Sequence, residues 1–539
     1  MTYALPWRGK TLASVVLALL SALVFWSPAV GEEAASLEPW PEGAFTDITV
    51  ESGIHEIVAA NYRAFPRWWL SGLHFVDLDG DGTLDFYMGT HGRFQAEDGT
   101  PGVFAALNDG TGRFRPAEGE YPISEIMLTH DLTGDGRLDI IMNYTDGGAE
   151  WWLNRSEPGR LQFENAGIRR GGNMGRIGVL IDIDGNGRLD WIRSHIDNVI
   201  IDRGDGEGGF IQNALLIPVT QDYRNAHTVI PSDLNGNGRI DLILEWGGYS
   251  YEDGRCRILR NDGDLKFTDV TEEWGLWEEG LAVKAVGDFN HNGFIDILAL
   301  DNLEWAVFMN DGTGRFTKKE NAISGMQGRI RYASWGLGVV TDFDNDGRAD
   351  ILVNGKHFLK LLRGDGTGSF TYMNRVAGIQ DYSAASIDDG LCFGDITGNG
   401  MLDIAGYVSR HPEIESPRGV PAIYRNDLPV RNWLRVRPIG AGGNAAAAGA
   451  VIRLTEPGTG RLLWHEEVRI FHRQAAQSYY GLFPTERHFG LADRETVDVS
   501  VRFHPSGQVV TLRDVAVNQA VEVSEAPAGE VSGATGEVE

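Results

Sequence analysis

The stretch Asp342-Phe343-Asp344-Asn345-Asp346-Gly347-Arg348-Ala349-Asp350 decides the fold of this chain. It follows the pattern Asp-x-Asp-x-Asp-Gly-x-apolar-Asp, and the apolar run Ile351-Leu352-Val353 follows directly. Asp, Asn and Gly favour tight turns, whereas a short β-branched run bounded by such turns favours a buried strand. A second apolar segment, Gly338-Val339-Val340, precedes the pattern. The stretch therefore predicts a loop that joins two strands.

The same pattern recurs along most of the chain. It begins at Asp77, Asp131, Asp182, Asp233, Asp288, Asp342 and Asp395, at intervals of 54, 51, 51, 55, 54 and 53 residues. So regular a period indicates that each repeat is one supersecondary unit. Several repeats carry a second turn, such as Asn310-Asp311-Gly312, which precedes an aromatic residue at Phe114, Phe267, Phe316 or Phe370. Each repeat is therefore expected to hold four strands.

Four short antiparallel strands in each of seven repeats predict an all-β fold, a seven-bladed β-propeller over residues 45–427, because radial closure protects the sheet edges. The 70 glycines and 15 tryptophans suit short strands joined by tight turns. The seventh repeat lacks its aromatic fourth strand. Residues 45–54 begin Phe-Thr-Asp-Ile-Thr, which echoes Phe267-Thr268-Asp269-Val270-Thr271. We expect this N-terminal strand to complete the last blade.

The loops place oxygen-bearing side chains at the first, third, fifth and ninth positions, with glycine at the sixth. Hard cations such as Ca²⁺ prefer ligands of this kind, whereas Mg²⁺ resists dehydration in an all-protein cage. An EF-hand is excluded, because the twelfth position holds residues such as Met88 and Val353 where that loop needs glutamate. The alternative is that the loops are turns without metal. Up to seven Ca²⁺ sites are expected.

The expected ligands are grouped by loop, and the two all-aspartate sets, the first and the sixth, should bind most tightly. They are Asp77, Asp79, Asp81 and Asp85; Asp131, Thr133, Asp135 and Asp139; Asp182, Asp184, Asn186 and Asp190; Asp233, Asn235, Asn237 and Asp241; Asp288, Asn290, Asn292 and Asp296; Asp342, Asp344, Asp346 and Asp350; and Asp395, Thr397, Asn399 and Asp403.

Charge and the N-terminus bear on location and partners. The formal net charge of −29 argues against nucleic acid and against anionic membrane surfaces as partners. Arg8 and Lys10 precede an apolar run over residues 12–26, and Ala29 and Gly31 fit a signal-peptidase site. Residues 1–31 are therefore expected to be a signal peptide, followed by a linker over 32–44. The protein is expected to be exported, to the periplasm or outside the cell, with no transmembrane helix in the mature chain.

The repeat ends at Asp427, and residues 428–524 are predicted to form a separate, small, sandwich-like β domain. Residues 525–539 are rich in Ala, Gly and Glu, so a disordered tail is expected. Cys256 and Cys392 fall on strands of blades that are not neighbours. They are predicted to be free, buried thiols.

The Asp-rich loops resemble the FG-GAP or VCBS repeat, whose propeller is similar to that of integrin α-subunits. The C-terminal region resembles the ASPIC/UnbV domain in Asn432-Trp433-Leu434, in residues 449–454, in residues 488–493 and in residues 501–507. The combination resembles bacterial relatives of the cartilage acidic protein family. His504 departs from the motif, where the aromatic residue usually precedes Pro-Ser-Gly directly, and only a local effect is expected. The resemblance implies calcium-dependent extracellular binding or adhesion.

Two classes of function remain open, and whether the protein is an enzyme is left uncertain. The first is a calcium-stiffened module that recognises a protein or a glycan. The alternative is a carbohydrate-active enzyme, a polysaccharide lyase or a glycosidase, with its reactive groups around the central channel. No catalytic residue is assigned, but the groups near the first strands are His74, His130, Arg176, His227, Lys284, Arg331, Asp388 and Asp389. A quinone-dependent dehydrogenase is a third interpretation, although its tryptophan-docking repeat is absent; Trp68, Trp69, Trp151, Trp152 and Trp335 are expected in blade cores.

Overall fold

The computed structural model is almost entirely β, as the repeat predicts. It describes residues 38–65, 68, 70–90, 102–123, 126–131, 133–144, 148–170, 177–195, 198–206, 209–219, 226–246, 255–326, 338–355, 358–380, 390–408, 420–442, 444–475, 478–479 and 486–526. The expected signal peptide and the expected tail beyond residue 526 lie outside these residues. No helix in the described part of the chain is long and apolar enough to cross a membrane.

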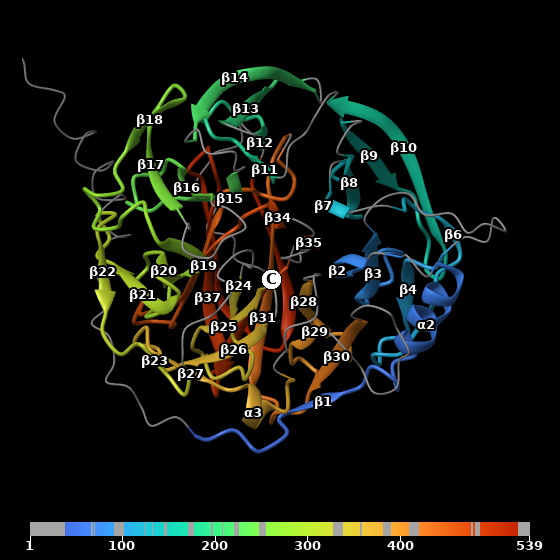
Figure 1. The fold of residues 1–539 in the computed structure, drawn as a ribbon. Coiled ribbons are helices and arrows are strands. Elements are labelled where there is room, and N and C mark those ends of the chain that lie inside the picture. The colour runs from blue at the N-terminus through green and yellow to red at the C-terminus, as the bar shows by residue number, and fades with distance from the viewer. Residues whose placement is uncertain are drawn as a thin grey trace, which may run out of the picture.

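The described residues form a β-propeller, in which seven small sheets lie around a common centre (Figure 1). We call them blades 1 to 7, in the order of their Asp-rich loops. Blades 1 to 3 contain β2 (Leu70–Val76), β3 (Asp85–Thr90), β4 (Ala105–Asn108) and β5 (Phe114–Pro116); β7 (Ile126–His130), β8 (Asp139–Tyr144), β9 (Gly148–Asn154) and β10 (Leu161–Arg170), with β6 (Gly119–Glu120) beside β10; and β11 (Ile177–Ile181), β12 (Asp190–His195), β13 (Asn198–Gly204) and β14 (Phe210–Pro218).

The next three blades repeat the four-stranded plan. They contain β15 (Ala226–Ser232), β16 (Asp241–Trp246), β17 (Arg255–Gly263) and β18 (Lys266–Asp269); β19 (Leu281–Gly287), β20 (Asp296–Asp301), β21 (Glu304–Asn310) and β22 (Phe316–Lys319); and β24 (Gly338–Thr341), β25 (Asp350–Gly355), β26 (Phe358–Gly364) and β27 (Phe370–Tyr372), with β23 (Ile323–Ser324) beside β27 and the short helix α3 (Asn374–Ala377) after it.

Blade 7 is built from both ends of the propeller. It consists of β28 (Leu391–Gly394), β29 (Asp403–Val408), β30 (Val420–Asn426) and β1 (Phe45–Asp47), and Phe45 pairs with Asn426. The N-terminal strand is shorter than the ten residues expected, because Asp47 Oδ1 accepts the backbone N–H of Thr49 at 3.0 Å and turns the chain. Helix α2 (Ile54–Ala64) then starts at Gly53, whose φ is +83°.

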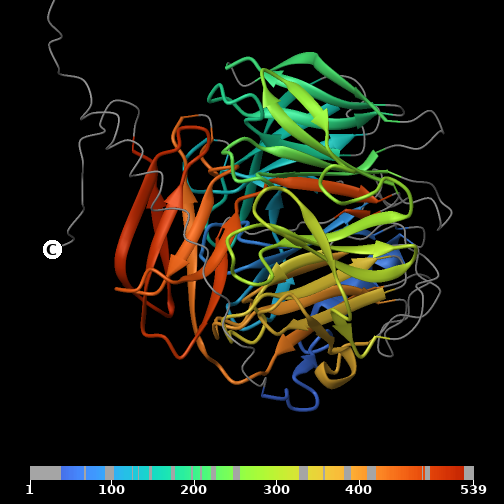
Figure 2. The same cartoon turned by 90° about the vertical axis from the view of Figure 1, so that its left-hand side faces the viewer.

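The C-terminal region forms a two-sheet sandwich on one side of the ring (Figure 2). One sheet contains β31 (Asn432–Ile439), β36 (Arg487–Ala492) and β39 (Gln519–Ser524); the other contains β32 (Val451–Thr455), β33 (Leu462–Glu467), β37 (Thr496–Arg502) and β38 (Val509–Ala516). Its core includes Leu434, Ile452, Phe489 and Val499, all fully buried.

The sandwich is less separate from the propeller than expected. Between β33 and β36 the chain forms β34 (Phe471–Ala475) and β35 (Ser478–Tyr479), and β34 pairs antiparallel with β11, the first strand of blade 3. We call β34 and β35 the channel hairpin, because both strands lie inside the ring near its centre (Figure 1). A segment of the C-terminal region therefore extends blade 3 from within.

Both cysteines are free and buried, which confirms the prediction. Cys256 lies on β17 of blade 4 and Cys392 on β28 of blade 7. Burial raises the pKa of both thiols. They are therefore held in the thiol form, which is a poor nucleophile and a poor metal ligand.

Candidate metal centres

Every Asp-rich loop joins the first strand of a blade to the second. In blade 6, Asp342 directly follows β24 and Asp350 is the first residue of β25, and the other six loops repeat this arrangement. Because each blade begins with its strand in the same direction, all seven loops lie on one face of the ring, which we call the loop face. The sandwich packs on this face: Arg437 donates to the carbonyl of Gly136 at 3.2 Å, and Ala492 N donates to the carbonyl of Asn345 at 2.9 Å.

The last aspartate of each loop ties the loop to the third strand. Asp350 accepts the N–H of Gly364 on Oδ1 at 2.9 Å and the N–H of Phe343 on Oδ2 at 3.0 Å. The same two bonds recur at Asp85, Asp190, Asp241, Asp296 and Asp403. A carboxylate has about four lone-pair sites, so these bonds leave it able to bind a cation as well.

The first and fifth positions shape the turn. Asp342 accepts the N–H of Asp346 at 3.1 Å and that of Gly347 at 2.7 Å. Asp346, at the fifth position, accepts the N–H of Arg348 at 3.0 Å. Asp81, Asp135, Asn237, Asn292 and Asn399 make the same bond two residues ahead. The fifth side chain, expected only as a ligand, is therefore also a cap of the turn.

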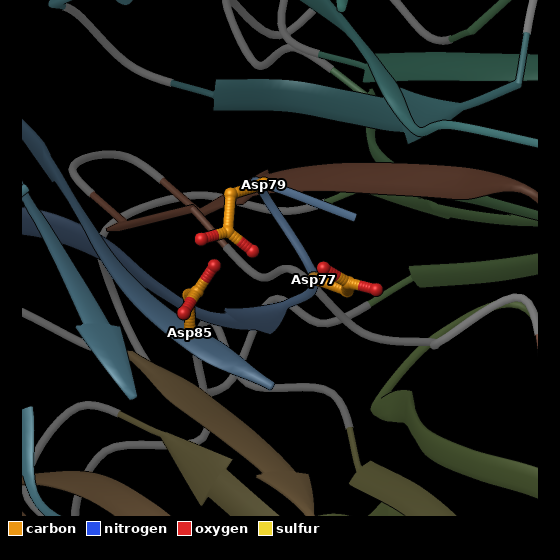
Figure 3. Close-up of side chains that lie close together, drawn as sticks. All are labelled: Asp77, Asp79 and Asp85. Carbon is orange, nitrogen blue, oxygen red and sulfur yellow. The ribbon is translucent and has the colours of Figure 1, made fainter. Parts of the chain in front are cut away.

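Three loops bring three carboxylates close together. In each loop the first, third and ninth residues offer oxygens within 4.8 Å of one another. Figure 3 shows the set in blade 1, where the carboxylates of Asp79 and Asp85 face each other and Asp77 lies beside them. The three sets are Asp77, Asp79 and Asp85; Asp182, Asp184 and Asp190; and Asp342, Asp344 and Asp350.

In the other four loops, the described residues bring no third carboxylate into such a set. Blade 2 has Thr133 at the third position, and its Asp135 turns to Arg137, with the charged atoms 2.7 Å apart. In blades 4 and 5 the side-chain oxygens of Asn235 and Asn290 accept backbone N–H groups at 3.1 and 3.3 Å. Thr397 of blade 7 contacts Asp403 at 3.4 Å.

Burial makes the ionised aspartates costly. Removal from water raises the pKa of Asp85 to about 8 and that of Asp190 to about 7. The pKa values of Asp342 and Asp350 are raised well above the ordinary value, by burial first and then by neighbouring carboxylates. A bound cation would reverse this effect, because it stabilises the ionised form.

Arginines already contact some of the loops, which the sequence analysis did not anticipate. In blade 6 the buried guanidinium of Arg363 lies 2.5 Å from Asp344 and 3.0 Å from Asp346. Arg502 of the sandwich lies 3.7 Å from Asp233, and Arg203 lies 2.6 Å from Asp184. These loops therefore carry part of their compensating charge within the protein. The loop of blade 1 has no such contact within the described residues.

Asparagines at the end of the third strands clamp neighbouring blades. Asn310 Nδ2 donates to the carbonyl of Ile295 in its own loop at 3.1 Å and to that of Leu234 in the loop of blade 4 at 2.8 Å. Asn108, Asn154, Asn261 and Asn426 make equivalent pairs of bonds. Where these asparagines begin an Asn-Asp-Gly pattern, the pattern predicted only a turn, although their fixed place before the second turn was a usable signal for this role.

The groups named for possible catalysis are buried where the structure describes them. Burial lowers the pKa of His74 to about 3 and that of His130 to about 4, so both rings are neutral. Lys284 is fully buried and lies 3.6 Å from Glu245. Trp68 is fully buried, and Trp151 and Trp152 are partly buried. Arg176, Arg331, Asp388, Asp389, Trp69, Trp335 and the side chain of His227 lie outside the described residues.

The fold and its loops define a β-propeller of Asp-rich repeats with a C-terminal sandwich. Residues 131–193, 233–299, 288–353 and 342–406 match the FG-GAP-like repeat, and residues 440–530 match the family described as ASPIC and UnbV. The chain is an FG-GAP repeat protein with a C-terminal ASPIC/UnbV domain.

Other comparisons add little. No curated protein sequence matches the chain. Among solved structures, a lectin of Agrocybe aegerita, described for its recognition of non-reducing terminal N-acetylglucosamine, is 19% identical, with 67% of this chain and 90% of that chain covered and a TM-score of 0.39. Rhamnogalacturonan lyase PL11 of Bacillus licheniformis is 13% identical, with 83% and 82% covered and a TM-score of 0.29. At these scores the likenesses carry no weight for function.

Proposed function

We propose that this protein is an exported, calcium-binding interaction module that recognises a protein or a glycan. The observation that carries the calcium part is the convergence of three carboxylates within 4.8 Å in each of three loops. Like charges at this separation raise one another's pKa unless a cation lies between them. Oxygen ligands of this kind suit Ca²⁺ better than softer metals.

The blade 1 loop is the site that the contacts support best. Among the described residues no arginine forms an ion pair with its aspartates, and Asp85 is fully buried. In blade 6, Arg363 neutralises part of the charge on Asp344 and Asp346. We therefore place the tightest site in blade 1, and we expect the blade 6 site to be weaker than its four aspartates alone would suggest.

The interaction part of the proposal rests on the family and on the position of the hairpin. The channel hairpin lies inside the ring, where a propeller enzyme could otherwise place reactive groups. The described candidates for such groups, His74, His130 and Lys284, are buried. Recognition by exposed surfaces requires no such constellation.

Export would be tested by the N-terminal mass of the secreted protein, which should begin after residue 31.

The calcium test combines a metal count with thermal unfolding. The purified protein should carry at least three Ca²⁺ per chain, one for each carboxylate set. Excess EDTA should lower its melting temperature. Asp85→Asn should reduce the count by one, because it removes a charged ligand of blade 1. Asp109→Asn is the matched control: Asp109 lies in the β4–β5 turn of the same blade, and its carboxylate accepts the N–H and the hydroxyl of Thr111 in that turn.

A protein without bound metal and with no response to EDTA would leave the loops as ordinary turns and would contradict the proposal. If the protein does bind Ca²⁺, partners are sought with the calcium-loaded protein on glycan arrays and in protein capture, and each experiment is repeated in EDTA. Binding that is lost in EDTA and restored by Ca²⁺ is the expected result.

A further inference from the structure

The asparagine clamps hold five of the seven blade boundaries. In blades 1, 2, 4, 5 and 7 the clamp asparagine donates to a loop carbonyl of the preceding blade, and blade 7 is the one that precedes blade 1. Blades 3 and 6 have glycine at the same place, Gly204 and Gly364, whose N–H groups donate to the last aspartate of the loop as the asparagine N–H groups do. The boundaries between blades 2 and 3 and between blades 5 and 6 therefore lack an asparagine clamp.

The backbone leaves no room for a side chain at these two glycines. A Cβ atom on Gly204 would lie 2.5 Å from the carbonyl oxygen of Leu189, and one on Gly364 would overlap the carbonyl oxygen of Ala349. Glycine is the residue that permits so close an approach of two backbone segments. In blades 3 and 6 the third strand therefore lies too close to its own loop for a clamp to form.

Apolar packing holds the boundary between blades 5 and 6 instead. Phe289 of blade 5 and Phe370 of blade 6 are both buried, with their rings perpendicular and their centroids 5.2 Å apart. They belong to one buried cluster with Leu298 and Ile351. Phe370 N also donates at 2.7 Å to the carbonyl of Ala322, in the segment that follows β22 of blade 5. This boundary is therefore held without help from the C-terminal region.

The apolar cluster at the boundary between blades 2 and 3 is smaller. Its buried members are Ile141 of blade 2 and Leu180 and Trp191 of blade 3. Trp151 of blade 2 meets Phe210 of blade 3 edge to face, with ring centroids 6.3 Å apart. Among the described residues, no hydrogen bond joins these two blades directly. Of the two boundaries without a clamp, this one has the weaker direct contact.

The C-terminal region bridges blades 2 and 3 in two places. Inside the ring, Ile470 packs against the apolar cluster of this boundary, and its carbonyl accepts the N–H of Leu180 at 3.1 Å. The channel hairpin follows directly: β34 pairs with β11 of blade 3 and lies against β7 of blade 2. On the loop face, Arg437 donates to a loop carbonyl of blade 2 and His504 to a loop carbonyl of blade 3. Both blades are thus tied to the same C-terminal region.

We propose that Ile470 and the channel hairpin form a clasp that closes the ring at the boundary of blades 2 and 3, so that their release opens the ring there before any other boundary. A partner that displaces the sandwich would then loosen the propeller at one defined place. Parts of a folded protein open with free energies below that of global unfolding, and hydrogen exchange measures these openings. The clasp uses no carboxylate of the Asp-rich loops, so it goes beyond the proposed calcium function.

The first test uses the unaltered mature chain. Hydrogen exchange in mild urea is measured for the amide of Leu180, which bonds to the clasp, and for those of Phe316 and Phe370, which bond across the boundaries of blades 4 and 5 and of blades 5 and 6. After correction for intrinsic rates, the Leu180 amide should exchange at least about tenfold faster than the other two, because release of the clasp precedes global unfolding. Equal rates, or a slower Leu180 amide, would overturn the proposal.

The second test removes the clasp, by replacing residues 470–479 with a Gly/Ser segment of equal length. Spin labels on Glu164→Cys and Gln212→Cys, both at exposed positions, report the distance between the outer strands of blades 2 and 3. Labels on Lys266→Cys and Thr317→Cys, also exposed, report the matched distance between blades 4 and 5. Both native cysteines are buried and should stay unlabelled.

Removal of the clasp should lengthen and broaden the distance between blades 2 and 3 and leave the distance between blades 4 and 5 unchanged. No change in the first distance, or equal changes in both, would count against the clasp. Circular dichroism would show whether the variant is folded, and if it is not, the exchange rates of the unaltered chain decide the point. Both tests are run in Ca²⁺ and in EDTA, so their outcome is independent of the calcium proposal.

Discussion

His504 Nε2 lies 2.7 Å from the carbonyl oxygen of Asp182, the residue that begins the Asp-rich loop of blade 3. A carbonyl only accepts, so this ring nitrogen donates. The effect of His504, expected to be local, instead reaches from the sandwich to the propeller. His504 is 8% exposed, and its ring packs where a side chain on Gly449 would stand.

His504→Ala should therefore weaken the attachment of the sandwich to blade 3. We expect a loss of about 1–3 kcal/mol in the free energy of unfolding, from the lost hydrogen bond and the carbonyl left without a partner. Urea denaturation measures it. His55→Ala is the control, since the one charged contact of His55 among the described residues is with the exposed Glu56, at 4.0 Å. Equal effects of the two substitutions would show that the contact is not specific.

The stability of the metal-free protein should depend on pH. Burial raises the pKa of Asp85 and Asp241 from 3.8 to about 8. The two carboxyl groups contribute their full share to the free energy of unfolding below about pH 4. This contribution is lost as the pH rises through about 8, because the folded state favours the protonated forms. Buried His74 and His488, whose pKa values are lowered to about 3, have the opposite effect: below about pH 6.5 they lower the free energy of unfolding as the pH falls, because only the unfolded chain binds their protons.

The informative window is therefore between about pH 6.5 and about pH 8. In EDTA the melting temperature should fall across it, and in millimolar Ca²⁺ the fall should disappear, because the ion stabilises the ionised carboxylates. Circular dichroism at several pH values measures both curves. Parallel curves with and without Ca²⁺ would contradict this prediction.

Arg363→Met should show how much charge compensation blade 6 receives from the protein. The substitution leaves Asp344 buried without its cation, whereas Asp346 keeps Arg348 at 3.4 Å, so we expect the free energy of unfolding in EDTA to fall by about 3–5 kcal/mol. Ca²⁺ should recover much of it by taking the place of the guanidinium. Arg425→Met is the control, because it removes a half-exposed ion pair with Asp427. It should lower the free energy of unfolding by about 1 kcal/mol or less, and Ca²⁺ should not reverse this loss. Denaturation of both variants with and without Ca²⁺ decides the point.

Glu467 fastens the sandwich to blade 4. It accepts from Ser232 Oγ at 2.7 Å, from Asp233 N at 3.0 Å and from Arg469 at 2.7 Å. Glu467→Ala should lower the free energy of unfolding by about 3–5 kcal/mol, because it leaves the buried Arg469 without its carboxylate partner. It should also make the link between Asp427 and β31 more sensitive to limited proteolysis. Glu456→Ala, in an exposed turn of the same sandwich, should change neither measurement.

The repeat spacing was sufficient to predict the propeller, because every loop joins two strands of one blade and the signal is local. Phe114, Phe316 and Phe370 open the fourth strands β5, β22 and β27, as the second turns predicted. Helix α2 was missed although Ile54, Ile57, Val58 and Tyr62 are spaced for one buried face. The echo of Phe267–Thr271 drew attention to strand-forming residues and away from this periodicity.

The contacts that could not be predicted join distant parts of the chain. No local pattern in residues 471–479 indicates that Ile177 would pair with Arg473. Nor does the sequence around Arg363 or Arg502 show that their side chains reach aspartates of the loops. For the same reason, only some of the expected ligand sets converge. The loop pattern specifies which residues carry carboxylates, whereas neighbouring arginines and turns decide the direction in which the side chains point.

The channel hairpin bears on how such a protein can change in evolution. Repeat arrays commonly gain or lose units by duplication or deletion, because each unit contacts only its neighbours. Here one hairpin spans the interior from β11 to β2, and the sandwich rests on loops of several blades at once. An added blade would widen the channel around a hairpin of fixed size and would move those loops away from the sandwich. The number of repeats is therefore held constant by a segment that is not itself a repeat.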